Sequence, residues 1–127
     1  MDYTIKNLRE TEDSATKFGL AEIGEAHFPR EELDAGETGL AYHVLKPNAR
    51  QAFGHRHEQA EEIFVVLSGG GRVRLDEEIV EISALDAIRV GPPVARAFEA
   101  GPDGLQLLAF GPRHEKDGEL LHDFWTD

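Results

Sequence analysis

Two histidines and a glutamate near the middle of the chain have the types and spacing of a metal-binding site. His55 and His57 are separated by one residue, and Glu62 follows after four more. Alternate side chains of a β-strand project from the same face, so both imidazoles would point the same way. A carboxylate that opens the next strand could supply a third ligand, and this set suits Fe(II), Mn, Ni or Zn. Two unrelated surface or core histidines would give the same local pattern. The elements around them must therefore show whether a metal site is formed.

Those surroundings predict short strands at intervals of about 8–12 residues, separated by glycine, proline and acidic turns. No segment between them has the length and period of a long helix. Ser68 and the three glycines at 69–71 predict a hairpin turn rather than a phosphate-binding loop, because no helix follows them. The pattern as a whole is typical of an all-β protein with an antiparallel sandwich or barrel. The expected strands cover residues 39–45, 50–57, 62–67, 72–75, 79–82, 86–90, 94–99 and 105–110.

Changes in composition divide the chain into three parts. Residues 1–37 are polar and acidic and predict an N-terminal arm, with a short helical turn capped at Asp13 and Ser14 and one short strand near residues 20–23. Residues 38–110 predict the barrel. Residues 111–127 predict a short C-terminal tail, whose His114, His122, Phe124 and Trp125 could cap the barrel mouth or pack on a partner subunit.

Composition excludes several classes of protein. The 127 residues fit one domain, and the absence of cysteine excludes disulfides, thiolate nucleophiles and cysteine-bound metals. The longest apolar run is far shorter than the roughly 18 residues of a membrane helix, and no signal peptide is visible, so we expect a cytoplasmic protein. The net charge of −12 argues against nucleic acid as a partner.

This charge is unevenly distributed. Residues 1–37 carry 10 acids and 4 bases, residues 38–110 carry 10 acids and 7 bases, and residues 111–127 carry 5 acids and 2 bases. The barrel segment therefore contributes only −3 of the total. The charge of the whole chain does not argue against a small anionic ligand inside the barrel.

The histidine cluster resembles the first motif of the cupins, which reads His-x-His, three or four residues, Glu, six residues, Gly. Here the glycine is Gly69. The run 85–100, with Asp86, a Gly-Pro-Pro turn and Phe98, is similar to the second cupin motif. The resemblance covers about residues 42–110 and implies a jelly-roll barrel.

One position departs from the family pattern. The third metal histidine of the cupins falls on Arg96, and a guanidinium offers only donors, so it cannot bind a metal. Two alternatives follow. Either His55, His57 and Glu62 hold a divalent metal without it, or Arg96 takes the place of the metal and pairs with Glu62. Arg96 could also hold the anionic group of a ligand.

Three further residues could contact that ligand. Gln51 and Phe53 share strand parity with the two histidines, and Tyr42 on the preceding strand could point into the barrel, as could its neighbour His43. The resemblance implies a metal-dependent enzyme of the dioxygenase or sugar-isomerase kind. The alternative is a metal-free module that binds or senses a small molecule. The arm and tail also lead us to expect a homodimer.

Overall fold

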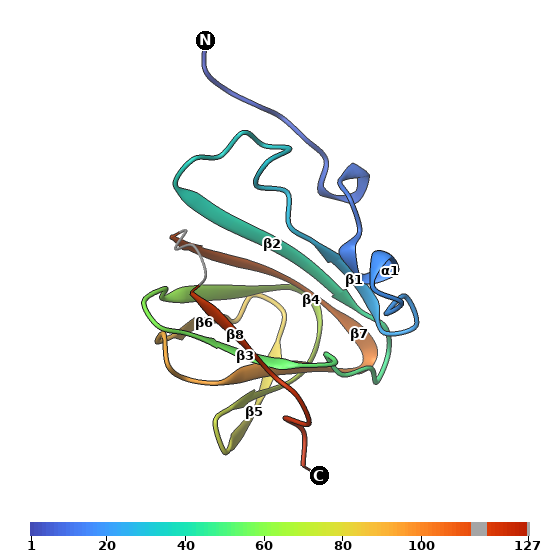
Figure 1. Ribbon diagram of the computed structural model, residues 1–127. Coiled ribbons are helices and arrows are strands. Elements are labelled where there is room, and N and C mark those ends of the chain that lie inside the picture. The colour runs from blue at the N-terminus through green and yellow to red at the C-terminus, as the bar shows by residue number, and fades with distance from the viewer. Residues whose placement is uncertain (113–116, 127) are drawn as a thin grey trace.

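Strands form most of the regular structure of the chain, which the computed structural model describes at residues 1–112 and 117–126. Every strand pairing found there is antiparallel, which confirms the all-β class. No helix within these residues is long and apolar enough to cross a membrane. In chain order (Figure 1) the elements are η1 (Leu8–Glu10), α1 (Ser14–Lys17), β1 (Gly24–His27), β2 (Thr38–Leu45), β3 (Gly54–His57), β4 (Glu62–Leu75), β5 (Glu78–Ser83), β6 (Ala87–Val90), β7 (Arg96–Pro112) and β8 (Gly118–Leu121).

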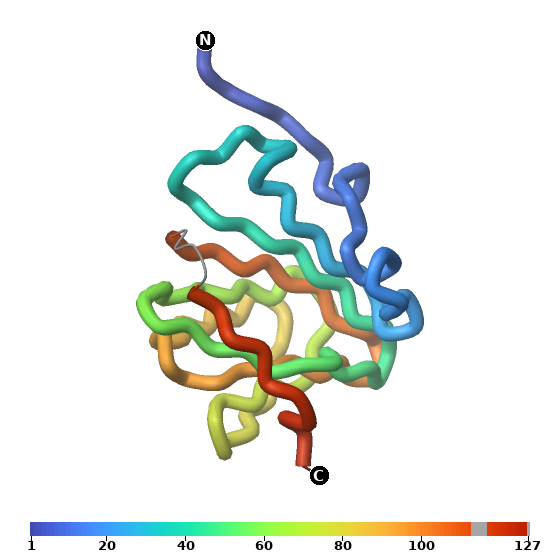
Figure 2. The backbone as a smooth tube through the Cα atoms, in the orientation of Figure 1, coloured from blue at the N-terminus to red at the C-terminus, as the bar shows by residue number. Residues whose placement is uncertain are grey.

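The strands form a single sheet that curls back on itself in a jelly roll. The order along it is β1-β2-β7-β3-β8, and β4 pairs with β5, β6 and β7. The two layers share β7, because its C-terminal part pairs with β2 while its first residue, Arg96, pairs with His55 of β3. In Figure 2, β1 and β2 lie along one side of the molecule, and β3 and β8 lie along the other. The expected antiparallel jelly-roll barrel is confirmed.

Residues 68–71 do not form the predicted turn, because β4 continues through them without reversing direction. Its pairing with β7 shifts register at Val66/Ser68 and again at Gly69/Gly71. A Cβ on Gly71 would lie 1.9 Å from the carbonyl oxygen of Glu99, so only glycine permits this approach. Such irregularities bend a strand and increase its twist. The glycines therefore bend β4, where the sequence suggested a reversal.

The short strand expected near residues 20–23 begins four residues later, as β1. Residues 21–23 form a turn, closed by a hydrogen bond from the Ile23 amide to the Leu20 carbonyl. Pairing with β2 starts at Gly24, opposite Leu45, where a Cβ would lie 1.8 Å from the Val44 carbonyl oxygen. The glycine thus sets the strand start, and the apolar side chain of Ile23 packs against the core.

An apolar core fills the space between the layers. Its centre is the pair Phe64 and Phe98, whose ring centroids are 4.8 Å apart. Phe64 belongs to β4 and Phe98 to β7, the two longest strands. Alternate side chains of each strand face inward, and both rings lie on the inward face. The other core members are Leu45, Val66, Val73, Ile82, Val90, Ala100, Leu105, Leu107 and Ala109.

The arm and the tail each add a strand to the sheet. Asp13 caps α1, as expected: its carboxylate accepts from the amides of Ala15 and, on β1, of Ala26, both at 3.0 Å. At the other end, Phe124 packs on Gly54, and the indole of Trp125 donates to the Gln51 carbonyl oxygen at 3.3 Å. Both aromatic residues thus pack on their own barrel. His114 lies outside the described residues, and the boundaries at 37 and 110 stay predictions.

The contact of Phe124 with Gly54 predicts that Gly54→Ala destabilises the fold. The new Cβ would lie 2.5 Å from Phe124 Cγ, so the tail must move. We expect a loss of about 1–3 kcal/mol in urea unfolding and a red-shifted emission of Trp125, the only tryptophan. Gly91→Ala is the matched control, since nothing lies within 4 Å of its Cβ. Equal stability of the two variants would contradict this account of the tail.

Candidate functional site

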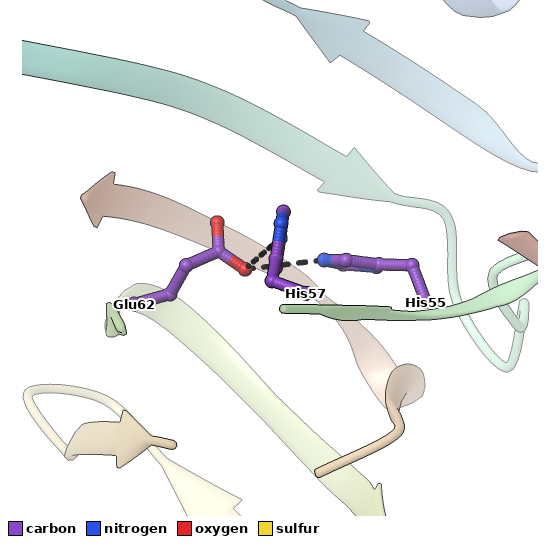
Figure 3. A group of neighbouring side chains, drawn as sticks. All are labelled: His55, His57 and Glu62. Atoms are coloured by element: carbon purple, nitrogen blue, oxygen red, sulfur yellow. Dashed lines mark hydrogen bonds and ion pairs between the residues drawn. The ribbon is translucent and has the colours of Figure 1, made fainter. Parts of the chain in front are cut away.

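The two histidines and the glutamate meet on the inner face of the barrel. His55 and His57 alternate along β3, and their ring centroids are 5.3 Å apart. Arg56, between them, points outward and donates to Glu119 at 2.7 Å. A four-residue loop then returns the chain to Glu62, the first residue of β4. Figure 3 shows both imidazoles and the carboxylate turned toward one another.

One carboxylate oxygen of Glu62 is the meeting point of this cluster. Its Oε1 lies 3.2 Å from His55 Nε2, 3.1 Å from His57 Nε2 and 3.1 Å from Arg96 Nη2. Burial raises the pKa of Glu62, but the hydrogen bond and charge of His55 and the charges of Arg96 and His57 outweigh it and lower the pKa. The carboxylate is therefore ionised at neutral pH.

Arg96 lies behind the carboxylate, with its side chain fully buried. Its Nη1 donates to the carbonyl oxygens of Val94, at 2.7 Å, and of Pro92, at 3.2 Å. The Gly-Pro-Pro turn of the sequence thus positions the guanidinium. Burial lowers the pKa of Arg96, opposed mainly by the charge of Glu62. Of the two positions that the sequence left open for Arg96, the structure shows the one in which it faces Glu62 as a buried counterion.

A cavity of about 610 Å³ opens in front of the cluster. Gln51 and Phe53 line it together with both histidines and Glu62, but the reason is not strand parity, because residues 51–53 precede β3 and Ala52 lines the cavity as well. The rest of its wall is mainly apolar and includes Leu20, Ile23, Ala26, Phe28, Leu40, Ala41, Leu45, Ala52 and Phe64.

Tyr42, like Arg96, was predicted to contact the ligand but is not among the residues that line this cavity. Its side chain is buried on the other face of β2, and its hydroxyl donates to Gln106 Oε1 at 2.8 Å. His43, next in sequence, lines the cavity instead. Burial, helped by the charge of His55, lowers the pKa of His43 to about 4, so its imidazole is neutral at neutral pH.

Sequence analysis missed Asp117, a buried carboxylate that orders the cluster from the tail. Its Oδ1 accepts from the amides of Glu58 and Gln59 at 3.0 and 2.9 Å, and its Oδ2 from Ala60 at 2.9 Å. Burial raises the pKa of Asp117, but the three N–H groups and the charge of His57 outweigh this effect, so the pKa lies below its usual value. Oδ2 is also 3.3 Å from His57 Nδ1. No local signal in the polar tail marks this residue.

The cluster fits the donor set of a divalent metal. Two donor atoms at about 2.1 Å from one ion, at tetrahedral or octahedral angles, lie about 3.0–3.4 Å apart. The separations of the two Nε2 atoms from Glu62 Oε1 fall in this range, and all three donor atoms lie within 4.8 Å of one another. His55, His57 and Glu62 could therefore hold a metal ion. A carboxylate on the outer nitrogen of one ligand, here Asp117 at His57, is common at such sites.

A curled antiparallel sheet with a histidine–carboxylate cluster on its inner face defines a jelly-roll barrel of the cupin class. The Cupin domain family matches residues 41–108, and the chain belongs to this family. The match includes Arg96 and the three residues of the cluster, but it leaves out the arm and Asp117.

Individual relatives are distant. The protein MJ1618 of Methanocaldococcus jannaschii is 30% identical over 81 residues, which are 61% of this chain and 65% of that protein. A cupin protein of Bacteroides fragilis, BF4112, superposes with a TM-score of 0.72 and 22% identity over 100% of this chain and 98% of its own. The polyketide cyclase RemF of Streptomyces resistomycificus gives 0.73 and 17% over 98% and 87%. At these identities the two structures are similar to this chain in fold.

The contacts of Asp117 predict that Asp117→Asn destabilises the loop after His57 and changes the surroundings of that histidine. The amide would present N–H donors to N–H groups, so at least one loop hydrogen bond is lost. We expect a lower urea midpoint and, in ¹⁵N NMR, an altered tautomer balance of His57. Asp123→Asn, an exposed position in the same tail, is the control and should change neither. An unchanged His57 spectrum in Asp117→Asn would remove Asp117 from the site.

Proposed function

We propose that this cupin binds a small, mainly apolar molecule in its barrel and does so without a metal. The observation that carries the proposal is the fully buried guanidinium of Arg96, 3.1 Å from the oxygen of Glu62 toward which both histidines point. By the resemblance described above, Arg96 stands where cupins have their third metal histidine. A cation built into the protein thus faces Glu62 in place of a bound ion.

The charges of the cluster support this proposal. One guanidinium and one carboxylate balance each other in a place with little water, and a buried charge is tolerated when it is paired in this way. A dication on His55, His57 and Glu62 would share the carboxylate with Arg96. The two cations would then repel each other where screening is weak.

The cavity supports a small molecule as the ligand. Its volume of about 610 Å³ and mainly apolar wall, with a few polar groups at one place, are typical of ligand sites. Gln51, Phe53 and the neutral His43 are the side chains that we expect to contact the ligand beside the two histidines. The Oε1 of Gln51 already accepts from the Phe98 amide at 3.1 Å, which fixes its orientation.

A metal-dependent enzyme is the second candidate, and the spacing of the three donor atoms favours it. His55, His57 and Glu62 would hold the ion, and Fe, Mn, Ni and Zn all suit this set. When bound, the ion would supply Lewis-acid chemistry next to the cavity. Arg96 would then hold Glu62 in place, and Asp117 would orient His57.

Replacing Arg96 by histidine separates the two candidates. We expect the wild type, purified without chelator, to retain less than about a tenth of an ion per chain, because Arg96 competes for Glu62. Arg96→His should retain close to one ion and bind Zn²⁺ at least about 100-fold more tightly, since it adds a ligand. Elemental analysis and calorimetric titration with Zn²⁺, Mn²⁺, Ni²⁺ and Fe²⁺ measure both quantities.

His55→Ala in the Arg96→His background is the control and should abolish the gained metal. Retention of about one ion per chain by the wild type, surviving dialysis, would overturn the metal-free proposal and support the second candidate. A wild type without metal that is stabilised against heat by a small molecule would support the first, because a ligand that binds only the folded state raises its stability.

The homodimer stays a prediction. The mass of the full chain in solution, measured by light scattering at several concentrations, should be close to twice the 14.1 kDa of one chain. A constant mass near that of one chain would contradict it.

A further inference from the structure

The charged residues around the cavity are unevenly paired. Each of the three glutamates in its wall has a cationic or histidine partner within the protein. Glu25 bonds to His27 at 2.9 Å, Glu62 pairs with Arg96 at 3.1 Å, and Glu119 pairs with Arg56 at 2.7 Å. Arg30 is the only lysine or arginine among the described residues that line the cavity. It forms no ion pair with any residue in 1–112 or 117–126.

Arg30 also carries a buried donor without an acceptor. Its Nε is enclosed, yet none of the described residues accepts a hydrogen bond from it. A buried N–H that has lost its water and gained no partner is destabilising, so such a group indicates a missing acceptor. The backbone at this point is ordered by turn hydrogen bonds from the Leu33 amide to Pro29 and from the Ala35 amide to Arg30. The guanidinium is therefore attached to a fixed turn.

The arm residues next to Arg30 form one wall of the same cavity. Phe28 lines it and packs edge-on against His43, with centroids 5.7 Å apart. The cluster of His55, His57 and Glu62 lines the cavity from β3 and β4. A molecule that fills the cavity would thus touch apolar side chains, the histidine cluster and an unpaired cation.

We propose that Arg30 binds a single carboxylate group of the ligand, which makes the ligand a small apolar carboxylic acid. This inference rests on the proposed small-molecule function and names the substrate class of that site. A carboxylate accepts the paired donors of a guanidinium, and a small movement of the side chain toward it would also give the enclosed Nε the acceptor that it lacks. The single cation in the described wall of the cavity favours a monoanion over a phosphate ester, whose second charge would have no cationic partner there.

Matched acids and amides test this proposal. The probes are 2-naphthoate and octanoate with their neutral amides, titrated into the full chain by calorimetry. In the wild type the acids should bind about tenfold or more tightly than the amides. Arg30→Gln should weaken binding of the acids until that difference disappears, and Arg30→Lys should keep part of it. The matched control is Arg9→Gln, an exposed arginine of the same arm outside the cavity, which should behave as the wild type.

Each outcome decides a different claim. Equal affinity for acid and amide in the wild type, or an acid preference that survives Arg30→Gln, would overturn the role of Arg30 while leaving cavity binding intact. Failure of all four probes to bind the wild type would count against the small-molecule function itself and the inference with it. Amide binding by Arg30→Gln reports that the variant is folded.

Discussion

The geometry of the site depends on the buried pairing of Glu62 with Arg96. Three strands meet at this one carboxylate oxygen, since the histidines come from β3, the glutamate from β4 and the arginine from β7. Without the guanidinium, the carboxylate would be a buried charge with only imidazoles to face it. Removing one member of a buried pair is strongly destabilising for this reason. The pair thus fixes the positions of the histidines and also holds β4 against β7.

Residues outside the cupin motifs also contribute to the site and to the wall of the cavity. The tail supplies Asp117, which holds the loop after His57 and touches the ring of that histidine. The arm supplies Phe28 and Arg30, which close one side of the cavity. The family match at residues 41–108 contains none of these three side chains. The cluster therefore lies within the family match, while the shape and charge of the cavity also depend on the flanking segments.

Local patterns in the sequence predicted those features that depend on period and spacing. Alternation placed His55 and His57 on one face, and the four-residue gap placed Glu62 opposite them. The phase of β2 could not be predicted in the same way, because either Tyr42 or His43 satisfies a period of two. Register with β1 and β7 decides it, and those pairings involve residues far away in the sequence.

Three other features depend on distant contacts in the same way. The glycines before Arg72 have the composition of a turn, but pairing with the backbones of both β5 and β7 keeps them within β4, with Gly69 at a φ of +74°. Pairing of Arg96 with Glu62 was one of the alternatives that the sequence left open, and the complete burial of Arg96 follows from packing against the Pro92 turn. Asp117 is part of no recognisable motif, and its partners at residues 57–60 are far away in the sequence, so its role could not be predicted.

The pairing of β3 has a consequence for the order of folding. His55 pairs with Arg96, 41 positions later, and Gly54 pairs with Leu121, 67 positions later. β3 has no nearer strand partner among the described residues, so a large loop must close before this strand gains any ladder hydrogen bond. Topologies dominated by such distant contacts fold slowly, in about milliseconds to seconds. We expect the local β4–β5 hairpin to form early and the histidine-bearing strand to join late, so that the chemical centre assembles after most of its scaffold.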